Sequence, residues 1–121
     1  MNVLIVDDSA AIRKILQRVL GQANLVISQV FEAGDGAEAL TILKQQQIGL
    51  VLSDINMPNM DGLELLCQVR ATEEWKHLPV VMITTEGSHN KVLEAVQLGA
   101  SGYVRKPFTP DQIKEKLAGL I

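Results

Sequence analysis

The fold of this chain is decided by one stretch, Ile48-Gly49-Leu50-Val51-Leu52-Ser53-Asp54-Ile55-Asn56-Met57-Pro58-Asn59-Met60-Asp61-Gly62. Its apolar first part leads directly into a carboxylate, and a loop rich in proline, asparagine, aspartate and glycine follows. This order predicts a buried strand that delivers Asp54 to the rim of a sheet, and then a loop and a helix. Because ligands of open α/β sheets bind at the carboxyl ends of the strands, Asp54 is the first candidate for a functional site.

Three other strand-like runs also lead into side chains that can do chemistry. They are short and mostly apolar, and they cover residues 3–6, 80–83 and 102–104. Asp7 and Asp8 follow the first run, Thr84 follows the second, and Lys106 comes just after the third. One polar residue at a strand end is weak evidence. Carboxylates, a hydroxyl and an amine at four strand ends of one parallel sheet predict a shared site.

Helical patterns separate these strands. Each predicted helix starts at or near a capping residue that precedes apolar residues at helical spacing. The predicted starts are Ser9, Asp35, Asp61, Ser88 and Thr109, and the first and fourth helices end near Gly21 and Gly99. A second strand is predicted over residues 24–33. Strands and helices thus alternate five times, which is typical of an α/β protein whose parallel sheet is covered by helices on both faces and joined by right-handed crossovers.

Size and composition fit one globular domain. The chain has 121 residues, of which 47% are hydrophobic and 21% are charged. We expect a single domain over residues 1–121, with no linker and no effector domain. The net charge of -3 argues against nucleic acid as a direct partner, because phosphate binding needs a basic face.

Other function classes are also disfavoured. The longest apolar runs fall short of the roughly 18 residues that a membrane-spanning helix needs, so we expect no membrane partner. Met1 and Asn2 lead straight into the first strand without a basic leader, so a cytoplasmic location is the default expectation. Cys67 is the one cysteine, which excludes an intrachain disulfide and a cysteine-based metal site.

The predicted site combines like charges with groups that bind anions. Asp7, Asp8 and Asp54 would repel one another at one sheet edge unless a cation compensates them. Oxygen ligands in a solvent-open pocket favour Mg²⁺. A carboxylate can also act as a nucleophile and form an aspartyl-phosphate. In such a reaction the Lys106 ammonium would neutralise phosphoryl oxygens and the Thr84 hydroxyl would donate to one of them.

Each of these residues also has an ordinary structural explanation. Asp8 alone could cap a helix, Thr84 could be a strand-end hydroxyl, and Lys106 could be a surface lysine. We interpret Asp61 as a helix cap and not as a ligand. Tyr103 alone would be a half-buried packing residue. The functional hypothesis therefore depends on the joint occurrence of the four strand-end positions.

The motifs as a whole resemble the receiver domain of two-component response regulators, and within that family the stand-alone chemotaxis regulators. The resemblance covers almost the whole chain. It is carried by residues 6–9 (Val-Asp-Asp-Ser), 53–54 with 56–65, Thr84, 99–104 and 106–108 (Lys-Pro-Phe). It implies a flavodoxin-like, doubly wound (β/α)5 fold with strand order 2-1-3-4-5.

The resemblance also assigns roles to individual residues. It makes Asp54 the phosphoacceptor, with Thr84 and Lys106 binding the phosphoryl group. Side chains of Asp7, Asp8 and Asp54 would hold Mg²⁺, together with the backbone carbonyl of Asn56. It further implies a cis peptide bond before Pro107, which an X-Pro bond permits at modest cost.

In the family, phosphorylation is read through a conformational switch. By resemblance, Thr84 moves toward the phosphoryl group and Tyr103 rotates inward. The face built from the fourth helix, fifth strand and fifth helix then changes partners. This implies a signalling protein and not an enzyme, which takes its phosphoryl group from a sensor histidine kinase and regulates a downstream protein in chemotaxis or motility. We expect a monomer, and whether it dimerises when phosphorylated is left open.

Positions that vary within the family carry further expectations. The residues two after the phosphoacceptor and two after the switch threonine are Asn56 and Glu86. This pair resembles the chemotaxis pattern and predicts a short-lived phosphate. Thr85 and Arg105 depart from that pattern, which bears on the partner and not on phosphorylation.

Three alternatives stay open. A stand-alone phosphorelay shuttle would use the same chemistry for a different output. A Mg²⁺-dependent phosphohydrolase with an aspartyl-phosphate intermediate would need an acid/base aspartate two residues after the nucleophile, where this chain has Asn56. A flavin-binding doubly wound domain would need a phosphate-cradling loop after the first strand, where Asp7 and Asp8 would repel the cofactor phosphate.

Overall fold

The predicted alternation forms a five-stranded parallel sheet in the computed structural model, which describes residues 1–23, 25–85 and 89–120. The strands are β1 (Asn2–Val6), β2 (Gln29–Ala33), β3 (Leu50–Ser53), β4 (Val80–Thr84) and β5 (Gly102–Arg105). Their order is β2-β1-β3-β4-β5, so the predicted strand order is confirmed. The central strands β1, β3 and β4 are buried almost throughout, which explains why their sequences are continuous apolar runs.

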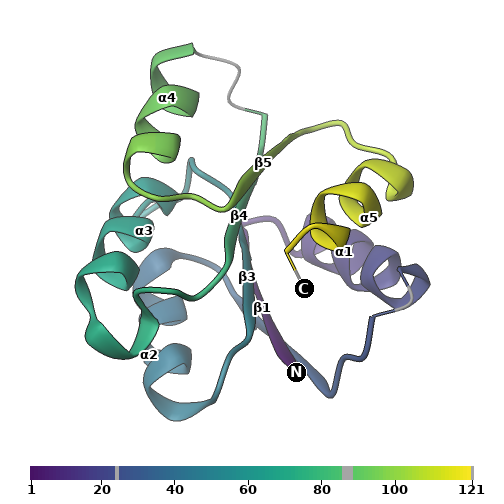
Figure 1. Cartoon of the computed structure of the whole chain (residues 1–121), viewed down its shortest axis with the longest axis horizontal. Coiled ribbons are helices and arrows are strands. Elements are labelled where there is room, and N and C mark those ends of the chain that lie inside the picture. The colour runs from purple at the N-terminus through teal and green to yellow at the C-terminus, as the bar shows by residue number, and fades with distance from the viewer. Residues whose placement is uncertain (24, 86–88, 121) are drawn as a thin grey trace.

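Helices cover both faces of the sheet. They are α1 (Ala10–Gln22), α2 (Gly36–Gln45), α3 (Gly62–Ala71), α4 (His89–Gln97) and α5 (Pro110–Ala118), with a short 3₁₀ helix, η1, over Glu73–Trp75. Figure 1 shows α1 and α5 on one side of the sheet and α2, α3 and α4 on the other. Successive strand residues serve opposite faces: Val3 and Ile5 join the core under α1 and α5, and Leu4 and Val6 join the other core. None of the described helices is long and apolar enough to cross a membrane.

Four helices begin at the predicted caps. The side-chain oxygens of Ser9, Asp35, Asp61 and Thr109 each accept a hydrogen bond from the backbone three residues on. This satisfies one of the free N–H groups at each helix start. Asp61 is therefore a cap, as predicted, and the cap of α1 is Ser9 and not Asp8. The Asp8 carboxylate is left available for another role.

The second strand is shorter than predicted. We expected it over residues 24–33, but β2 begins at Gln29, and residues 25–28 lie outside the strand. Gln29 pairs with Asn2, the first residue of β1, so earlier residues have no strand to pair with. Val26 is 87% exposed, which confirms that it contributes to no core. Asn24 lies outside the described residues, as does Ser88, the predicted start of the fourth helix.

Candidate functional site

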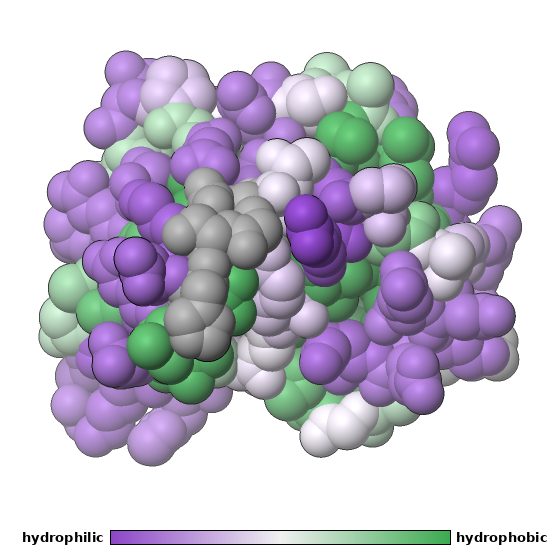
Figure 2. Space-filling model, turned by 90° about the horizontal axis from the view of Figure 1, so that it is seen from above, coloured by the Kyte–Doolittle hydropathy of each residue, from purple (hydrophilic) through white to green (hydrophobic). Residues whose placement is uncertain are grey.

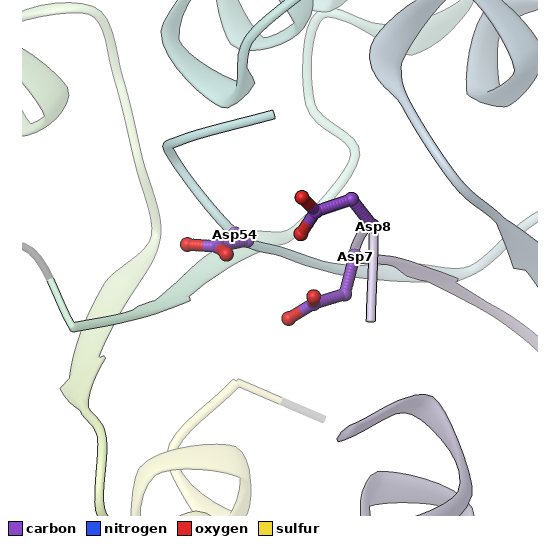
Figure 3. A group of neighbouring side chains, drawn as sticks. All are labelled: Asp7, Asp8 and Asp54. Atoms are coloured by element: carbon purple, nitrogen blue, oxygen red, sulfur yellow. The ribbon is translucent and has the colours of Figure 1, made fainter. Parts of the chain in front are cut away.

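Three carboxylates converge at the carboxyl edge of the sheet. Asp7 and Asp8 follow β1 and Asp54 follows β3, and the register that pairs Val6 with Ser53 brings them to the same level. The Asp54 N–H donates to the Val6 carbonyl at 2.9 Å, which extends that pairing by one residue. One carboxylate oxygen from each aspartate lies within 4.8 Å of the other two (Figure 3). Asp7 and Asp54 are buried, whereas Asp8 is exposed.

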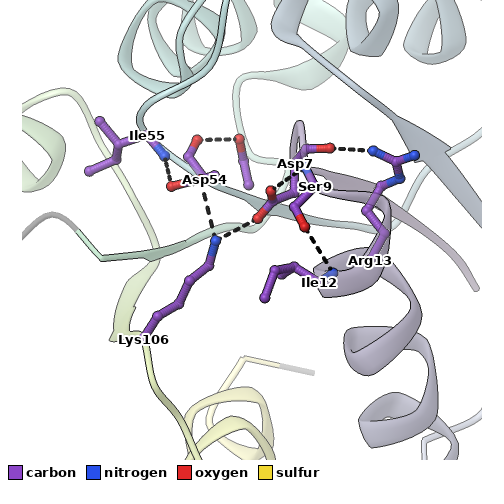
Figure 4. A network of polar contacts seen from close by, with 8 residues as sticks. Asp7, Ser9, Ile12, Arg13, Asp54, Ile55 and Lys106 are labelled. Carbon is purple, nitrogen blue, oxygen red and sulfur yellow. Dashed lines mark hydrogen bonds and ion pairs between the residues drawn. The ribbon is translucent and has the colours of Figure 1, made fainter.

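The Lys106 ammonium joins two of these carboxylates. Its Nζ lies 2.6 Å from Asp7 Oδ2 and 3.3 Å from Asp54 Oδ2 (Figure 4). The Lys106 side chain is only 11% exposed. Its backbone N–H donates to the Thr84 carbonyl at 2.9 Å, and the peptide bond before Pro107 is cis, as expected. The predicted acids and the predicted amine therefore meet in one place.

The electrostatic balance of this edge favours a second cation. Burial raises the pKa of the Asp7 carboxyl, and the nearby Asp54 charge adds to this rise, although hydrogen bonds from Lys106 and from the Ser9 backbone oppose it. One ammonium thus compensates part of the charge of three clustered carboxylates. The donor set consists of oxygen atoms and is open to solvent on the Asp8 side, which fits a small divalent ion such as Mg²⁺. The carboxyl ends of the strands point toward the top of Figure 1. Figure 2 views the molecule from that side and shows a mostly hydrophilic surface.

The backbone of Asp54 is fixed by the start of α3. Asp54 Oδ1 accepts a hydrogen bond from the Ile55 N–H at 2.7 Å, and the Gly62 N–H donates to the Ile55 carbonyl at 2.8 Å. A Cβ atom at Gly62 would lie 2.0 Å from the Asp54 carbonyl oxygen. No side chain fits there, so glycine lets the helix start pack directly on the phosphoacceptor candidate.

The sequence interpretation missed Arg13, which supports Asp7 from α1. The Arg13 guanidinium donates to the Asp7 backbone carbonyl (Figure 4). It also donates to Glu32 Oε1 at 3.0 Å. The hydrogen bond from Arg13 is the main cause that lowers the pKa of Glu32. The Ser9 N–H donates to Asp7 Oδ1 at 2.9 Å. An arginine in an amphipathic helix carries no sequence signal for such contacts, because its partners lie in other elements.

The other predicted residues lie on neighbouring elements. Thr84 ends β4 and is fully buried, and Tyr103 lies on β5, half-buried against the core on the α2–α3–α4 side. Asn56 is exposed in the loop that follows Asp54. Glu86, the second variable position, lies outside the described residues. The structure therefore brings Asp7, Asp8, Asp54 and Lys106 together. It places Thr84 at the end of β4, Tyr103 within β5 and Asn56 in the loop after β3.

Comparison with known proteins gives a consistent result over almost the whole chain. The family model described as response regulator receiver domain matches residues 3–118. The chain is 46% identical over 117 residues to chemotaxis protein CheY-3 of Vibrio cholerae serotype O1, covering 97% of this chain and 88% of that protein. It is 44% identical over 117 residues to chemotaxis protein CheY of Pseudomonas aeruginosa, covering 97% and 93%.

Solved structures share the fold. Chemotaxis protein CheY4 of Vibrio cholerae superposes with a TM-score of 0.88 at 37% identity, over 99% of this chain and 98% of that one. The Mn²⁺-bound form of response regulator Rcp1 superposes with a TM-score of 0.80 at 28% identity, over 98% and 90% of the two chains. The strand order and the helix arrangement are therefore those of a known structural family.

Proposed function

Because the chain belongs to the family of response regulator receiver domains, we propose that it is a phosphorylation-operated switch that signals in chemotaxis or motility. The observation that carries this proposal is the position of the Lys106 ammonium, which contacts both Asp54 and Asp7 at the carboxyl edge of the sheet. A nucleophilic carboxylate beside a fixed cation suits phosphoryl transfer, which depends on positioning and charge neutralisation.

In the proposed reaction Asp54 takes a phosphoryl group from a phosphohistidine of a sensor kinase. A carboxylate oxygen of Asp54 forms the new P–O bond as the P–N bond breaks, and the imidazole nitrogen keeps the electron pair of that bond. The Lys106 ammonium then pairs with phosphoryl oxygens, and the Thr84 hydroxyl donates to one of them. The later attack of water on phosphorus returns Asp54 and releases inorganic phosphate, which resets the switch.

The acidic cluster supports a role for a divalent cation. Asp7, Asp8 and Asp54 would hold Mg²⁺ with the backbone carbonyl of Asn56, and the ion would neutralise charge on the transferring group. The Mn²⁺-bound form of the related Rcp1 supports this assignment of a divalent site. The protein side chains orient Asp54 and exclude part of the solvent, since Asp54 is 8% exposed.

We propose that the output is a change in protein binding at the face of α4, β5 and α5. Tyr103 lines a cavity of about 590 Å³ between β5 and α5, together with Arg105 and Lys106. On α4, the apolar side chains of Leu93 and Val96 are 45% and 59% exposed, so a partner protein could pack against them. Phosphorylation would shift the population toward the form in which Thr84 and Tyr103 have moved, and a downstream protein would bind that form. A phosphorelay shuttle is the alternative output of the same chemistry.

The direct test is intact mass after incubation with Mg²⁺ and acetyl phosphate. The wild type should gain one phosphoryl group, and Asp54→Asn should gain none. Asp61→Asn is a matched control, because asparagine can still cap α3 and the Asp61 carboxylate takes no part in the reaction. No mass gain in the wild type, or an equal gain in Asp54→Asn, would contradict the proposal.

A further inference from the structure

The loop between β3 and α3 rests on the start of another helix. Asn59 Nδ2 donates to Asp35 Oδ2 at 2.8 Å, and the Gly36 N–H donates to the Met60 carbonyl at 3.0 Å. Asp35 and Gly36 form the N-terminal end of α2, more than twenty residues earlier in the chain. Residues 55–61 therefore contact α2 through one side-chain bond and one backbone bond, both well formed.

The loop packs closely against the start of α2. A Cβ atom at Gly36 would lie 2.7 Å from Met60 Cγ and 2.9 Å from the Met60 carbonyl oxygen. Asn59 has a φ of 65°, a left-handed conformation that asparagine tolerates better than most residues. At its far end the loop is held by Gly62, which packs on the Asp54 carbonyl. The path of the loop is thus fixed by its two ends and by α2.

Asp35 uses its two oxygens for different purposes. Oδ1 accepts from the Glu38 N–H at 2.8 Å and caps α2, whereas Oδ2 accepts from Asn59. The cap and the loop contact can therefore be separated by mutation. A serine at position 35 could cap the helix, but it would offer no second oxygen to Asn59.

We propose that Asp35, Gly36 and Asn59 form a loop clamp that positions the β3–α3 loop for cation binding at Asp54. This rests on the proposed function, in which the Asn56 carbonyl in this loop is one ligand of the ion. The clamp residues are positioning residues, since they act through the loop and touch neither the ion nor the phosphoryl group. Asn56 is separated from Asn59 by two residues, so a loop released from α2 would lose the defined direction of that carbonyl.

Reversal of the hydrogen bond gives a sharp test. Asn59→Gly keeps the backbone freedom and removes the contact, so Mg²⁺ affinity measured by calorimetry should fall about three- to tenfold. Asn59→Asp places a carboxylate against Asp35 and should weaken binding further. The double variant Asp35→Asn with Asn59→Asp restores the contact with donor and acceptor exchanged, and its affinity should return to within about twofold of the wild type. Thr41→Ala removes an exposed hydrogen bond that lies within α2, from the Thr41 hydroxyl to the Ala37 carbonyl, and should leave the affinity unchanged.

A second readout needs no metal. In Mg²⁺-free protein, exchange of the Gly36 and Gly62 amide hydrogens should be faster in Asn59→Gly and should slow again in the exchanged pair, because both amides donate into the loop. Wild-type Mg²⁺ affinity in both single variants, or unchanged amide exchange, would overturn the clamp and leave the role of Asp54 intact. A wild type that binds no Mg²⁺ would instead overturn the cation site of the proposed function, and the clamp with it.

Discussion

Each end of the sheet holds one positively charged side chain that is largely shielded from solvent, but the partners of the two side chains differ. At the carboxyl end, Lys106 Nζ contacts the carboxylates of Asp7 and Asp54. At the amino end, Arg70 of α3 donates to backbone carbonyls that precede β4 and β5. Its Nη1 lies 2.7 Å from the Leu78 oxygen, and its Nε and Nη2 lie 3.0 and 2.9 Å from the Gly99 oxygen.

This difference suits the amino end of the sheet to a role in stability and the carboxyl end to a role in chemistry. The carbonyl acceptors of Arg70 are neutral and belong to the backbone, so the arginine joins the ends of α3 and α4 to the strand starts permanently. Burial lowers the pKa of Arg70, but a guanidinium stays protonated at neutral pH. The acceptors of Lys106 are charged and clustered, so another cation or a phosphoryl group can change the balance around them. Under the proposed function, the carboxyl end is therefore the part that switches, and the amino end stabilises the fold around it.

The largest effect is expected for a substitution of Gly62, because the start of α3 supports both the stability of the fold and the position of Asp54. Gly62→Ala would place a Cβ 2.0 Å from the Asp54 oxygen, so α3 and Asp54 must separate. We expect a loss of about 3 kcal/mol of unfolding free energy in urea and no phosphorylation by acetyl phosphate. Gly21→Ala is the matched control, because Gly21 lies within α1 with no atom within 4 Å of a new Cβ. It should stabilise the protein by about 0.5–1 kcal/mol. A folded, phosphorylated Gly62→Ala would show that α3 does not position Asp54.

Arg70→Ala should affect stability alone. It removes the donor for Leu78 and Gly99 carbonyls, and we expect a loss of about 2 kcal/mol in the same urea titration, with the phosphorylation rate of the folded protein unchanged. Added Mg²⁺ should restore none of the difference. Arg18→Ala on the exposed side of α1 should stay within about 0.5 kcal/mol of the wild type. A slower phosphoryl transfer in Arg70→Ala would mean that the two ends are coupled.

The strands and the helix caps could be predicted because their sequence signals are local. A continuous apolar run and a capping side chain act within a few residues, so β1, β3, β4 and the caps of α1, α2, α3 and α5 follow from neighbouring positions. The predicted start of the second strand was wrong, because the length of β2 depends on where β1 begins and not on the pattern of β2 itself.

The same reasoning explains which parts of the site were predictable. Asp7, Asp8, Asp54 and Lys106 end strands, and parallel strands bring their carboxyl ends to one edge. The partners of Arg13, Arg70 and Asn59 lie in other elements, so no periodicity indicates them. Asn59 did stand in a turn-rich stretch, but nothing in that stretch points to Asp35.

Lys106→Met tests what the charge of the ammonium contributes at the carboxyl end of the sheet. Without the ammonium, the buried Asp7 keeps a carboxylate neighbour and loses its cation, so we expect the protein to be destabilised in Mg²⁺-free buffer. Because the pocket becomes more negative, Mg²⁺ should bind several-fold more tightly and raise the melting temperature more than in the wild type, while phosphorylation slows. Lys44→Met on the exposed surface of α2 is the control. Equal Mg²⁺ responses in Lys106→Met and the wild type would indicate that the lysine and the ion do not share these carboxylates.

Arg13 combines the two kinds of acceptor, because it donates to the neutral Asp7 carbonyl and to the charged Glu32. The hydrogen bond from Arg13 lowers the pKa of Glu32 below its ordinary value of 4.5. Glu32 therefore adds stability that is fully present above about pH 4.5 and is lost as the pH falls through the lower folded-state pKa. Glu32→Gln should remove this contribution, so its unfolding free energy should fall less steeply than that of the wild type below pH 4.5. The difference should be a few tenths of a kcal/mol, because the side chain is 34% exposed and solvent screens the pair.

A double-mutant cycle with Arg13→Met assigns that slope to the pair. If Arg13 is the main cause, Glu32→Gln should have a smaller effect on the acid dependence of stability once Arg13 is absent. The phosphorylation rate tests the contact with Asp7. Arg13→Met also removes the hydrogen bond to the Asp7 carbonyl, so it should slow phosphoryl transfer. Glu32→Gln leaves that bond in place, so it should leave the phosphorylation rate unchanged. An equal slowing in both variants would mean that the charged contact, and not the neutral one, orients Asp7.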